Sequence, residues 1–180
     1  MVLIICLAPT ANASSSGMNF INTTLSSATD AYTNSVTVNP NNTIIASSYD
    51  TFIELHNSST LQLMDRFDLG REVFDIEFSP DGRYIAATTL AIESIPDSVK
   101  VIDILDMEIK PQQARGNNRA SNIDWSHDGS MLIVPNMNNG ALVLNSTHLG
   151  EVMALNGVHT SDVTCVGFSR NSELMITGDE

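Results

Sequence analysis

The sequence predicts an all-β fold assembled from repeated strand–turn–strand units. One tight turn occurs four times, and its copies start at residues 39, 79, 126 and 169, so the intervals are 40, 47 and 43 residues. Repeats of roughly 40–50 residues that carry several short strands are typical of β-propellers and similar arrays. No apolar pattern of helical period extends over about ten residues or more. We therefore expect β-propeller blades of four antiparallel strands.

Each copy of the turn has the residue types that tight turns favour. Ser or Asn stands first, Asp or Asn third, and Gly, Asn or Ser fourth. Asp and Asn hydrogen-bond to nearby backbone, and Gly or Asn accepts a positive φ. An apolar residue directly precedes every copy, so each copy predicts a β-hairpin. The four turns are Asn39-Pro40-Asn41-Asn42, Ser79-Pro80-Asp81-Gly82, Ser126-His127-Asp128-Gly129 and Ser169-Arg170-Asn171-Ser172.

The array covers residues 35–180, with repeats that start near residues 35, 73, 121 and 163. Repeat four has two strands before Glu180, so we expect about three and a half blades and a ring that is not closed in this chain. The chain is then an N-terminal piece of a longer propeller, or a half-propeller that a second chain completes. The strands are expected near 35–39, 43–49, 52–56 and 61–67 in repeat one, near 73–79, 84–89, 98–104 and 106–110 in repeat two, and near 121–126, 131–135, 140–145 and 150–155 in repeat three.

The residues before the repeats have a different character. Residues 1–13 hold a short apolar run and then Ala11-Asn12-Ala13, a small-x-small pattern that signal peptidases accept. The run is too short to span a bilayer, which takes about 20 apolar residues. We interpret it as a signal peptide cleaved after Ala13, which predicts an extracellular or periplasmic protein. The alternative is a buried first strand in a cytoplasmic protein. Residues 14–34 predict a polar linker followed by a short outer strand.

The charge of the chain limits its partners. Eight Lys and Arg residues stand against 21 Asp and Glu residues, a net charge of −13. Nucleic acids and anionic membranes both attract cationic surfaces, so we expect neither as a partner, and no stable membrane span. Arg115 and Arg119, in a predicted loop at Pro111–Ala120, form the one local basic spot. Cys165 is expected to be a small buried strand residue.

Two segments resemble the WD-repeat β-propeller family. Val73–Thr88 is similar to the first hairpin of that family: an apolar strand, Ser-Pro-Asp-Gly, and an apolar strand ending in small residues. Gly157–Asp179 is similar too, with His159 before the strand and Thr177-Gly178 at the end of the next. The resemblance implies a hydrogen-bonded set of His, Ser or Thr, Asp and Trp, of which His159 and Thr177 are present. The Trp-Asp dipeptide that closes each third strand is absent, and Leu55-His56, Ile104-Leu105 and Leu144-Asn145 stand near those places.

The sequence carries no motif for catalysis or for a cofactor. It lacks phosphate-binding and dinucleotide-binding glycine loops, zinc and calcium ligand patterns, and the serine nucleophile elbow. We expect no cofactor and no metal. By analogy with the fold, we expect a non-enzymatic scaffold that binds a protein or peptide. The alternative is part of a propeller enzyme, a hydrolase or an oxidoreductase, whose active site lies in further blades.

Carboxylates alternate along the predicted first strands. Asp75 and Glu77 lie in repeat two, and Asp124 takes the place of Glu77 in repeat three. First strands are innermost in a propeller, so we expect these side chains to face the channel, where they could bind a cation or a basic peptide. The alternative is that neighbouring backbone or water satisfies them. In an exported chain, four residues match the N-glycosylation pattern: Asn22, Asn41, Asn57 and Asn145.

Overall fold

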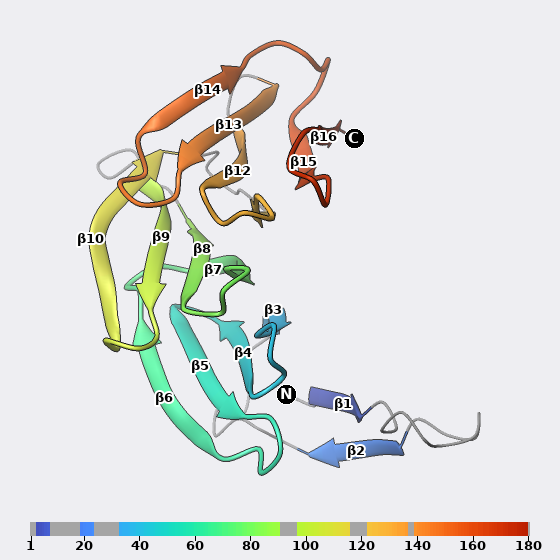
Figure 1. Cartoon of the computed structure of the whole chain (residues 1–180), viewed down its shortest axis with the longest axis vertical. Coiled ribbons are helices and arrows are strands. Elements are labelled where there is room, and N and C mark those ends of the chain that lie inside the picture. The colour runs from blue at the N-terminus through green and yellow to red at the C-terminus, as the bar shows by residue number, and fades with distance from the viewer. Residues whose placement is uncertain are drawn as a thin grey trace. The chain divides into compact units, whose positions relative to one another are not determined.

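The computed structural model describes residues 3–7, 19–23, 33–90, 97–115, 122–136 and 139–179. The chain divides into two compact units, Met1–Tyr32 and Thr33–Glu180. In the first unit, β1 (Leu3–Leu7) pairs antiparallel with β2 (Asn19–Thr23) (Figure 1). β2 lies within residues 14–34, the segment for which the sequence predicts a polar linker with an outer strand. Cleavage after Ala13 and export stay predictions of the sequence.

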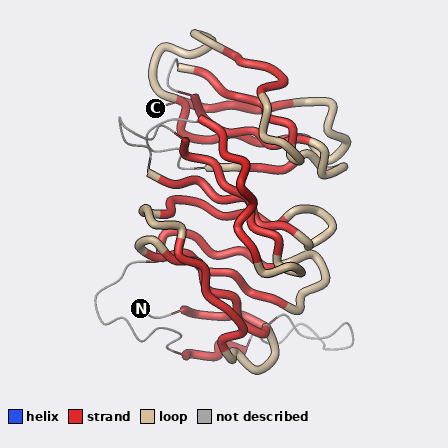
Figure 2. The backbone as a smooth tube through the Cα atoms, turned by 90° about the vertical axis from the view of Figure 1, so that its left-hand side faces the viewer, coloured by secondary structure: helices blue, strands red, loops and turns tan. Residues whose placement is uncertain are grey.

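The second unit is the predicted array of antiparallel sheets, which we call blades 1 to 4. The described residues contain only strands, turns and loops, and no sheet closes into a barrel (Figure 2). Three sheets have four strands and the last has two, which confirms about three and a half blades. Blade 1 contains β3 (Thr33–Val38), β4 (Ile44–Tyr49), β5 (Phe52–Asn57) and β6 (Leu63–Asp68), and blade 2 contains β7 (Val73–Phe78), β8 (Tyr84–Thr89), β9 (Asp97–Asp103) and β10 (Glu108–Arg115). Blade 3 contains β11 (Asp124–Trp125), β12 (Met131–Asn136), β13 (Gly140–Asn145) and β14 (Glu151–Leu155), and blade 4 contains β15 (Val163–Phe168) and β16 (Met175–Asp179).

The four recurring turns adopt one conformation, for the reasons that their residue types suggest. The fourth residue has a positive φ in every copy: Asn42 at 58°, Gly82 at 73°, Gly129 at 73° and Ser172 at 58°. Its backbone N–H donates to the carbonyl oxygen of the first residue at 2.8–2.9 Å. The side-chain oxygen of the first residue accepts the N–H of the residue five positions later, at 2.9 Å in all four turns. In the last three turns, the first-residue hydroxyl also donates to the Asp or Asn in third place. Ser or Asn first and Asp or Asn third are therefore structural requirements of the turn.

Successive blades pack face to face through apolar side chains. Alternate residues of a strand point to opposite faces, so Ile85 and Ala87 of β8 face blade 1 while Ala86 between them faces blade 3. Trp125 belongs to the core between blades 2 and 3 with 6% of its surface exposed, as expected for the residue before a turn. Burying a large aliphatic side chain contributes about 1.5–3 kcal/mol, which makes these interfaces the main source of stability.

Two expectations, one about Cys165 and one about the loop at Pro111–Ala120, are wrong. Cys165 is exposed, because Val166 and Phe168 of β15 pack on blade 3 and Cys165 points to the other face. The predicted loop at Pro111–Ala120 begins as strand, since β10 extends to Arg115. A register shift between Ile109 and Gln113 accommodates Pro111, which has no N–H to donate, on this edge strand. Arg119 lies outside the described residues.

The corner between the third and fourth strands is made by one residue in each complete blade. Asn57, Asp103 and Asn145 end their strands, and each is paired with the first residue of the second strand. The Oδ1 atom of each accepts two backbone N–H groups of the following turn, at 2.9–3.3 Å. These six bonds explain why Asn or Asp stands at every corner.

The strand pairing corrects the sequence alignment of two of these corners. The corner dipeptides are His56-Asn57 and Ile102-Asp103, whereas the sequence suggested Leu55-His56 and Ile104-Leu105. Leu144-Asn145 was placed correctly. Apolar residues occur on both sides of each corner, so the pattern does not fix the register and only the strand pairing does. Blade 2 therefore retains the Asp of the Trp-Asp dipeptide, although the Trp is replaced by Ile102.

Candidate functional site

The first strands of neighbouring blades lie side by side, β3 with β7, β7 with β11 and β11 with β15. Asp75 of β7 joins three of these blades. Its Oδ1 accepts a hydrogen bond from Ser35 Oγ at 2.7 Å, and its Oδ2 accepts one from Ile123 N at 3.0 Å and one from Asn122 Nδ2 at 3.3 Å. This carboxylate is thus used to connect blades 1, 2 and 3.

Asp124 connects blade 3 to blade 4 in a similar way. Its Oδ2 accepts the backbone N–H of Phe168 at 2.6 Å, and Asn122 Oδ1 accepts that of Val166 at 2.7 Å. Burial raises the pKa of Asp124, while the hydrogen bonds from Phe168 N and Trp125 N act in the opposite direction. Its carboxylate is half-buried and held in place.

Glu77 occupies the same place in β7 as Asp124 does in β11, but its side chain is not held. In the described part of the chain no hydrogen bond or ion pair reaches its carboxylate; only its backbone oxygen accepts a bond, from Trp125 Nε1 at 3.1 Å. Burial, and then repulsion from Asp124 and Asp75, raise the pKa of Glu77 to about 7. A half-buried carboxylate with a perturbed pKa is a candidate for ligand binding.

Glu77 and Asp124 line a cavity of about 540 Å³, which we call the inner pocket. Its volume is within the range of roughly 300–1,000 Å³ found for ligand pockets. It combines apolar side chains from four blades with two carboxylates and the exposed Arg170. The inner pocket is lined by Val38, Glu77, Phe78, Asp124, Trp125 and Phe168, and by Pro40, Pro80, His127, Ser169 and Arg170 of the turns.

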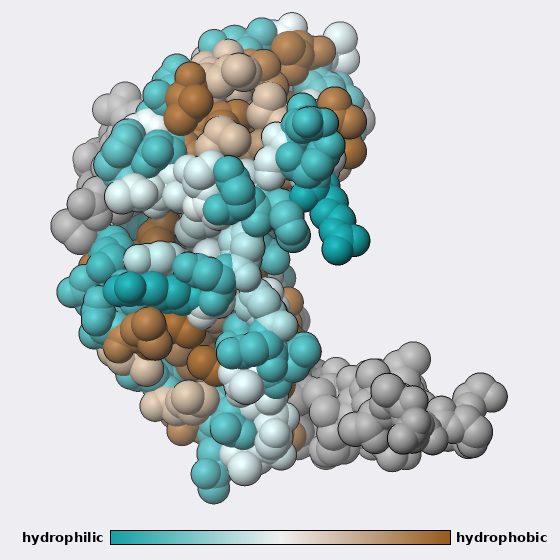
Figure 3. Space-filling model, viewed as in Figure 1, coloured by the Kyte–Doolittle hydropathy of each residue, from teal (hydrophilic) through white to brown (hydrophobic). Residues whose placement is uncertain are grey.

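The four turns touch one another and form a continuous row, which we call the turn row (residues 39–42, 79–82, 126–129 and 169–172). A Cβ at Gly82 would lie 3.2 Å from Pro40 Cδ, and one at Gly129 would lie 3.8 Å from Pro80 Cδ. His127 N donates to Ser172 Oγ at 2.9 Å. The surface over the turns is mostly hydrophilic (Figure 3).

A second cavity, of about 660 Å³, lies between blades 2 and 3, and we call it the outer pocket. The two pockets share Pro80, Trp125 and His127, so they adjoin at the turn row. The outer pocket is lined by Tyr84, Val101 and Lys110 of blade 2, by Trp125, Ser146, Thr147 and Leu149 of blade 3, and by the turn residues Ser79, Pro80, Asp81, His127, Asp128 and Gly129.

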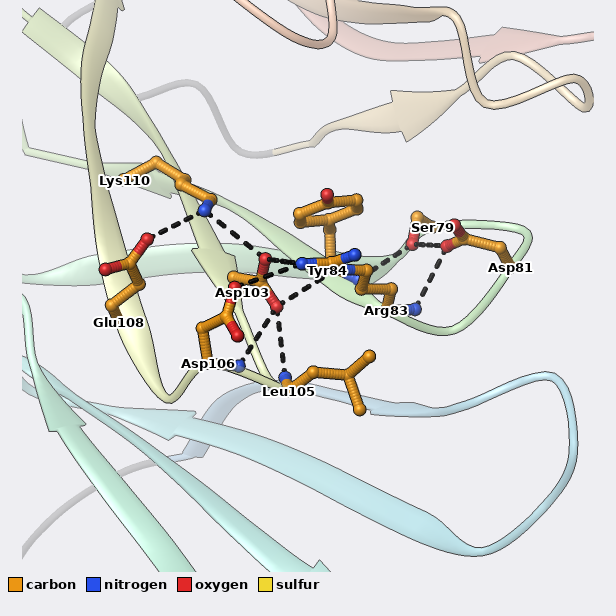
Figure 4. Close-up of polar contacts among 9 residues, drawn as sticks. All are labelled: Ser79, Asp81, Arg83, Tyr84, Asp103, Leu105, Asp106, Glu108 and Lys110. Atoms are coloured by element: carbon orange, nitrogen blue, oxygen red, sulfur yellow. Dashed lines mark hydrogen bonds and ion pairs between the residues drawn. The ribbon is translucent and has the colours of Figure 1, made fainter.

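Ion pairs next to the outer pocket fix the corner of blade 2 (Figure 4). The fully buried carboxylate of Asp103 accepts bonds from Arg83 Nη2 at 2.8 Å and Nε at 3.1 Å, and lies 3.3 Å from Lys110 Nζ. The bond from Arg83 is the main cause that holds the pKa of Asp103 well below its usual range. Lys110 also binds Glu108 at 2.7 Å. These charges are paired, and their role is structural.

The remaining residues suggested by the sequence are dispersed. His159 Nε2 lies 2.7 Å from Thr177 Oγ1, and its Nδ1 lies 3.4 Å from Asp179 Oδ1. Asn41 is exposed in the first turn, and Asn57 and Asn145 are the corner residues described above. Asn22 lies in β2. Glycosylation of these residues stays a prediction.

One buried polar cluster, in blade 1, has only a weak signal in the sequence. Tyr49 donates to Glu54 Oε1 at 2.8 Å, and His56 Nε2 lies 3.3 Å from Glu54 Oε2. Burial, and then the hydrogen bond to Glu54, raise the pKa of Tyr49 to about 12. His56 lies in β5 with 2% of its surface exposed. Glu54 and His56 alternate along β5, which is the only sequence signal of the cluster.

Two kinds of feature are absent from the described residues. No group of three or more His, Cys, Asp or Glu side chains there could hold a metal ion. None of the described segments is a helix long and apolar enough to cross a membrane.

The repeated four-stranded antiparallel sheets, packed face to face with adjoining first strands, define the blades of a β-propeller. Residues 150–180 match the family described as WD domain, G-beta repeat. This segment comprises β14, β15 and β16. The match to this segment and the all-strand architecture fit a WD-repeat-like propeller. A comparison with curated proteins finds no match.

Proposed function

We propose that this chain is a non-enzymatic scaffold that binds a protein or peptide partner, and that the inner pocket receives a cationic side chain of that partner. WD-repeat propellers generally serve in protein interaction, which supports the first part. The observation that carries the second part is the Glu77 carboxylate, which lacks a hydrogen-bond partner among the described residues and is half-buried in the inner pocket.

A cation suits this pocket for electrostatic reasons. Glu77 is repelled by the carboxylates of Asp75 and Asp124, so a positive group beside it relieves that repulsion. The apolar surfaces of Val38, Phe78 and Phe168 can contact the aliphatic stem of an Arg or Lys side chain. The net charge of −13 favours the approach of a basic partner.

The test is the affinity of the full chain for short Gly/Ser peptides that contain one Arg or, as a control, one Gln. We expect the Arg peptide to bind more tightly, and Glu77→Gln to weaken its binding by about tenfold, as the loss of a charged contact near 1.4 kcal/mol would. The same change at the exposed Glu151 of β14, outside both pockets, removes an equal charge and should leave affinity within about twofold. Equal effects of Glu77→Gln and Glu151→Gln would refute the pocket assignment.

A further inference from the structure

We propose that the outer pocket binds an apolar side chain of the same peptide whose cationic side chain occupies the inner pocket, so that the ligand crosses the turn row between blades 2 and 3. This inference rests on the proposed function and specifies the ligand further: a linear segment with one basic and one large apolar residue.

The two pockets are continuous at the residues they share. Pro80, Trp125 and His127 line both, with Pro80 and His127 each in second place of their turn. A chain leaving the inner pocket therefore passes over these two turn residues to reach the outer pocket. Pro80 also lies against Gly129, which keeps the two turns together under the peptide.

The base of the outer pocket is apolar. Val101 of blade 2 and Trp125 and Leu149 of blade 3 line the pocket and are each 4–6% exposed, so each contributes a small apolar area to its wall. A branched aliphatic or aromatic side chain placed there removes apolar surface of both the ligand and the pocket from water, which stabilises the complex by about 25 cal/mol per Å² buried. Such central apolar anchors carry much of the energy of protein interfaces.

The charged groups around the outer pocket are already paired, which argues against an ion as its ligand. Lys110 binds Glu108 at 2.7 Å and Asp103 at 3.3 Å. Asp128 accepts bonds from Ser126 and Ser130, and Asp81 accepts bonds from Ser79 and from Arg83 N. A new ion would have to displace these bonds, whereas an apolar side chain needs only the apolar base.

The contrast between the pockets thus defines a bipartite ligand. The inner pocket holds a carboxylate with no partner among the described residues, which complements a cation. The outer pocket holds paired ions above an apolar base, which complements an apolar group. One peptide linking both groups gains the second contact without a second cost of association.

The test measures fluorescence anisotropy of labelled Gly/Ser peptides that carry Arg alone, Leu alone, or both at each spacing that a short peptide allows. The blocking variant is Thr147→Trp. Thr147 is exposed, lines the outer pocket, and holds the corner only through its backbone N–H to Asn145 Oδ1 at 3.0 Å, which the variant keeps. The matched control is Ser59→Trp, at the same place of the blade 1 corner, where Ser59 N bonds Asn57 Oδ1 at 3.0 Å.

At the best spacing, we expect Leu to tighten binding of the Arg peptide by about tenfold, the usual effect of one good apolar anchor. Thr147→Trp should abolish that gain and leave the Arg-dependent binding, while Ser59→Trp should preserve both. If Leu adds less than about twofold at every spacing, or if Thr147→Trp acts no differently from Ser59→Trp, the outer-pocket inference is refuted and the proposed function stands. Binding that is sensitive to Thr147→Trp but independent of Arg and of Glu77 would refute the proposed function and, with it, the joint occupancy.

Discussion

Gly82→Ala should destabilise the blades more than the same change at Gly70 or Gly129. All three glycines have φ between 71° and 73°, so an added Cβ has the same unfavourable backbone conformation in each. They differ in what that Cβ would meet: Pro40 Cδ at 3.2 Å for Gly82, Pro80 Cδ at 3.8 Å for Gly129, and nothing within 4 Å for Gly70. The comparison isolates the contact between the first two turns.

The magnitudes follow from these distances. The left-handed conformation costs a residue with a Cβ about 1–2 kcal/mol. The contact of 3.8 Å at Gly129 is an ordinary van der Waals distance and adds little. At Gly82 the contact of 3.2 Å is too short, and the Pro40 ring cannot rotate away, so we expect roughly 1 kcal/mol more.

The assay is urea unfolding followed by the fluorescence of Trp125, the one tryptophan, which is buried between blades 2 and 3. We expect the midpoint to fall furthest for Gly82→Ala, with similar smaller shifts for Gly129→Ala and Gly70→Ala. In a Pro40→Ala background, the additional loss at Gly82 should disappear, because the atom that clashes has been removed. An equal loss at Gly82 and Gly70, or no coupling to Pro40, would show that the turns of blades 1 and 2 do not touch and would refute the reasoning.

Three further predictions concern single residues. Gly140→Ala should lower the melting temperature by more than Gly129→Ala does, because its Cβ would overlap the backbone oxygen of Leu155 and open the pairing of β13 with β14. Asp103→Asn should preserve the corner but lower the free energy of unfolding at neutral pH. Because the folded-state pKa of Asp103 is lowered, the stabilisation by its carboxylate is present above the unfolded-state pKa of about 4 and is lost as the pH falls below that value. The urea midpoints of the wild type and the variant should therefore converge in acid. The pKa of Glu77 is raised to about 7, so binding of the Arg peptide should weaken between about pH 8 and pH 6 as the carboxylate is protonated, and anisotropy titrations of Glu77→Gln should lack this dependence.

Much of the fold follows from local sequence. In the second turn, Ser79, Asp81 and Gly82 are needed for hydrogen bonds and a positive φ that all lie within five residues of one another. This residue pattern therefore predicts the turn, and the four copies of the pattern predict the number of blades. Trp125 lies in the core and directly precedes the third turn, the place that an apolar residue takes in every copy. The corners were harder to place, since apolar residues on both sides leave the register open until the strands pair.

The candidate site was predicted only in outline. Asp75, Glu77 and Asp124 are equivalent as acidic residues of first strands, and the repeat pattern alone predicts that they lie on adjoining strands. The packing of the blades shows that backbone N–H groups of the next blade hold Asp75 and Asp124, whereas no hydrogen bond in the described residues holds the carboxylate of Glu77. It also decided that the inner and outer pockets meet at Trp125, and that Cys165 is exposed. The difference lies in the range of the interactions. Turns are made by neighbours in sequence, whereas the bonds that Asp75, Asp124 and Trp125 make between blades join residues 40 or more positions apart, whose separation depends on how whole sheets pack.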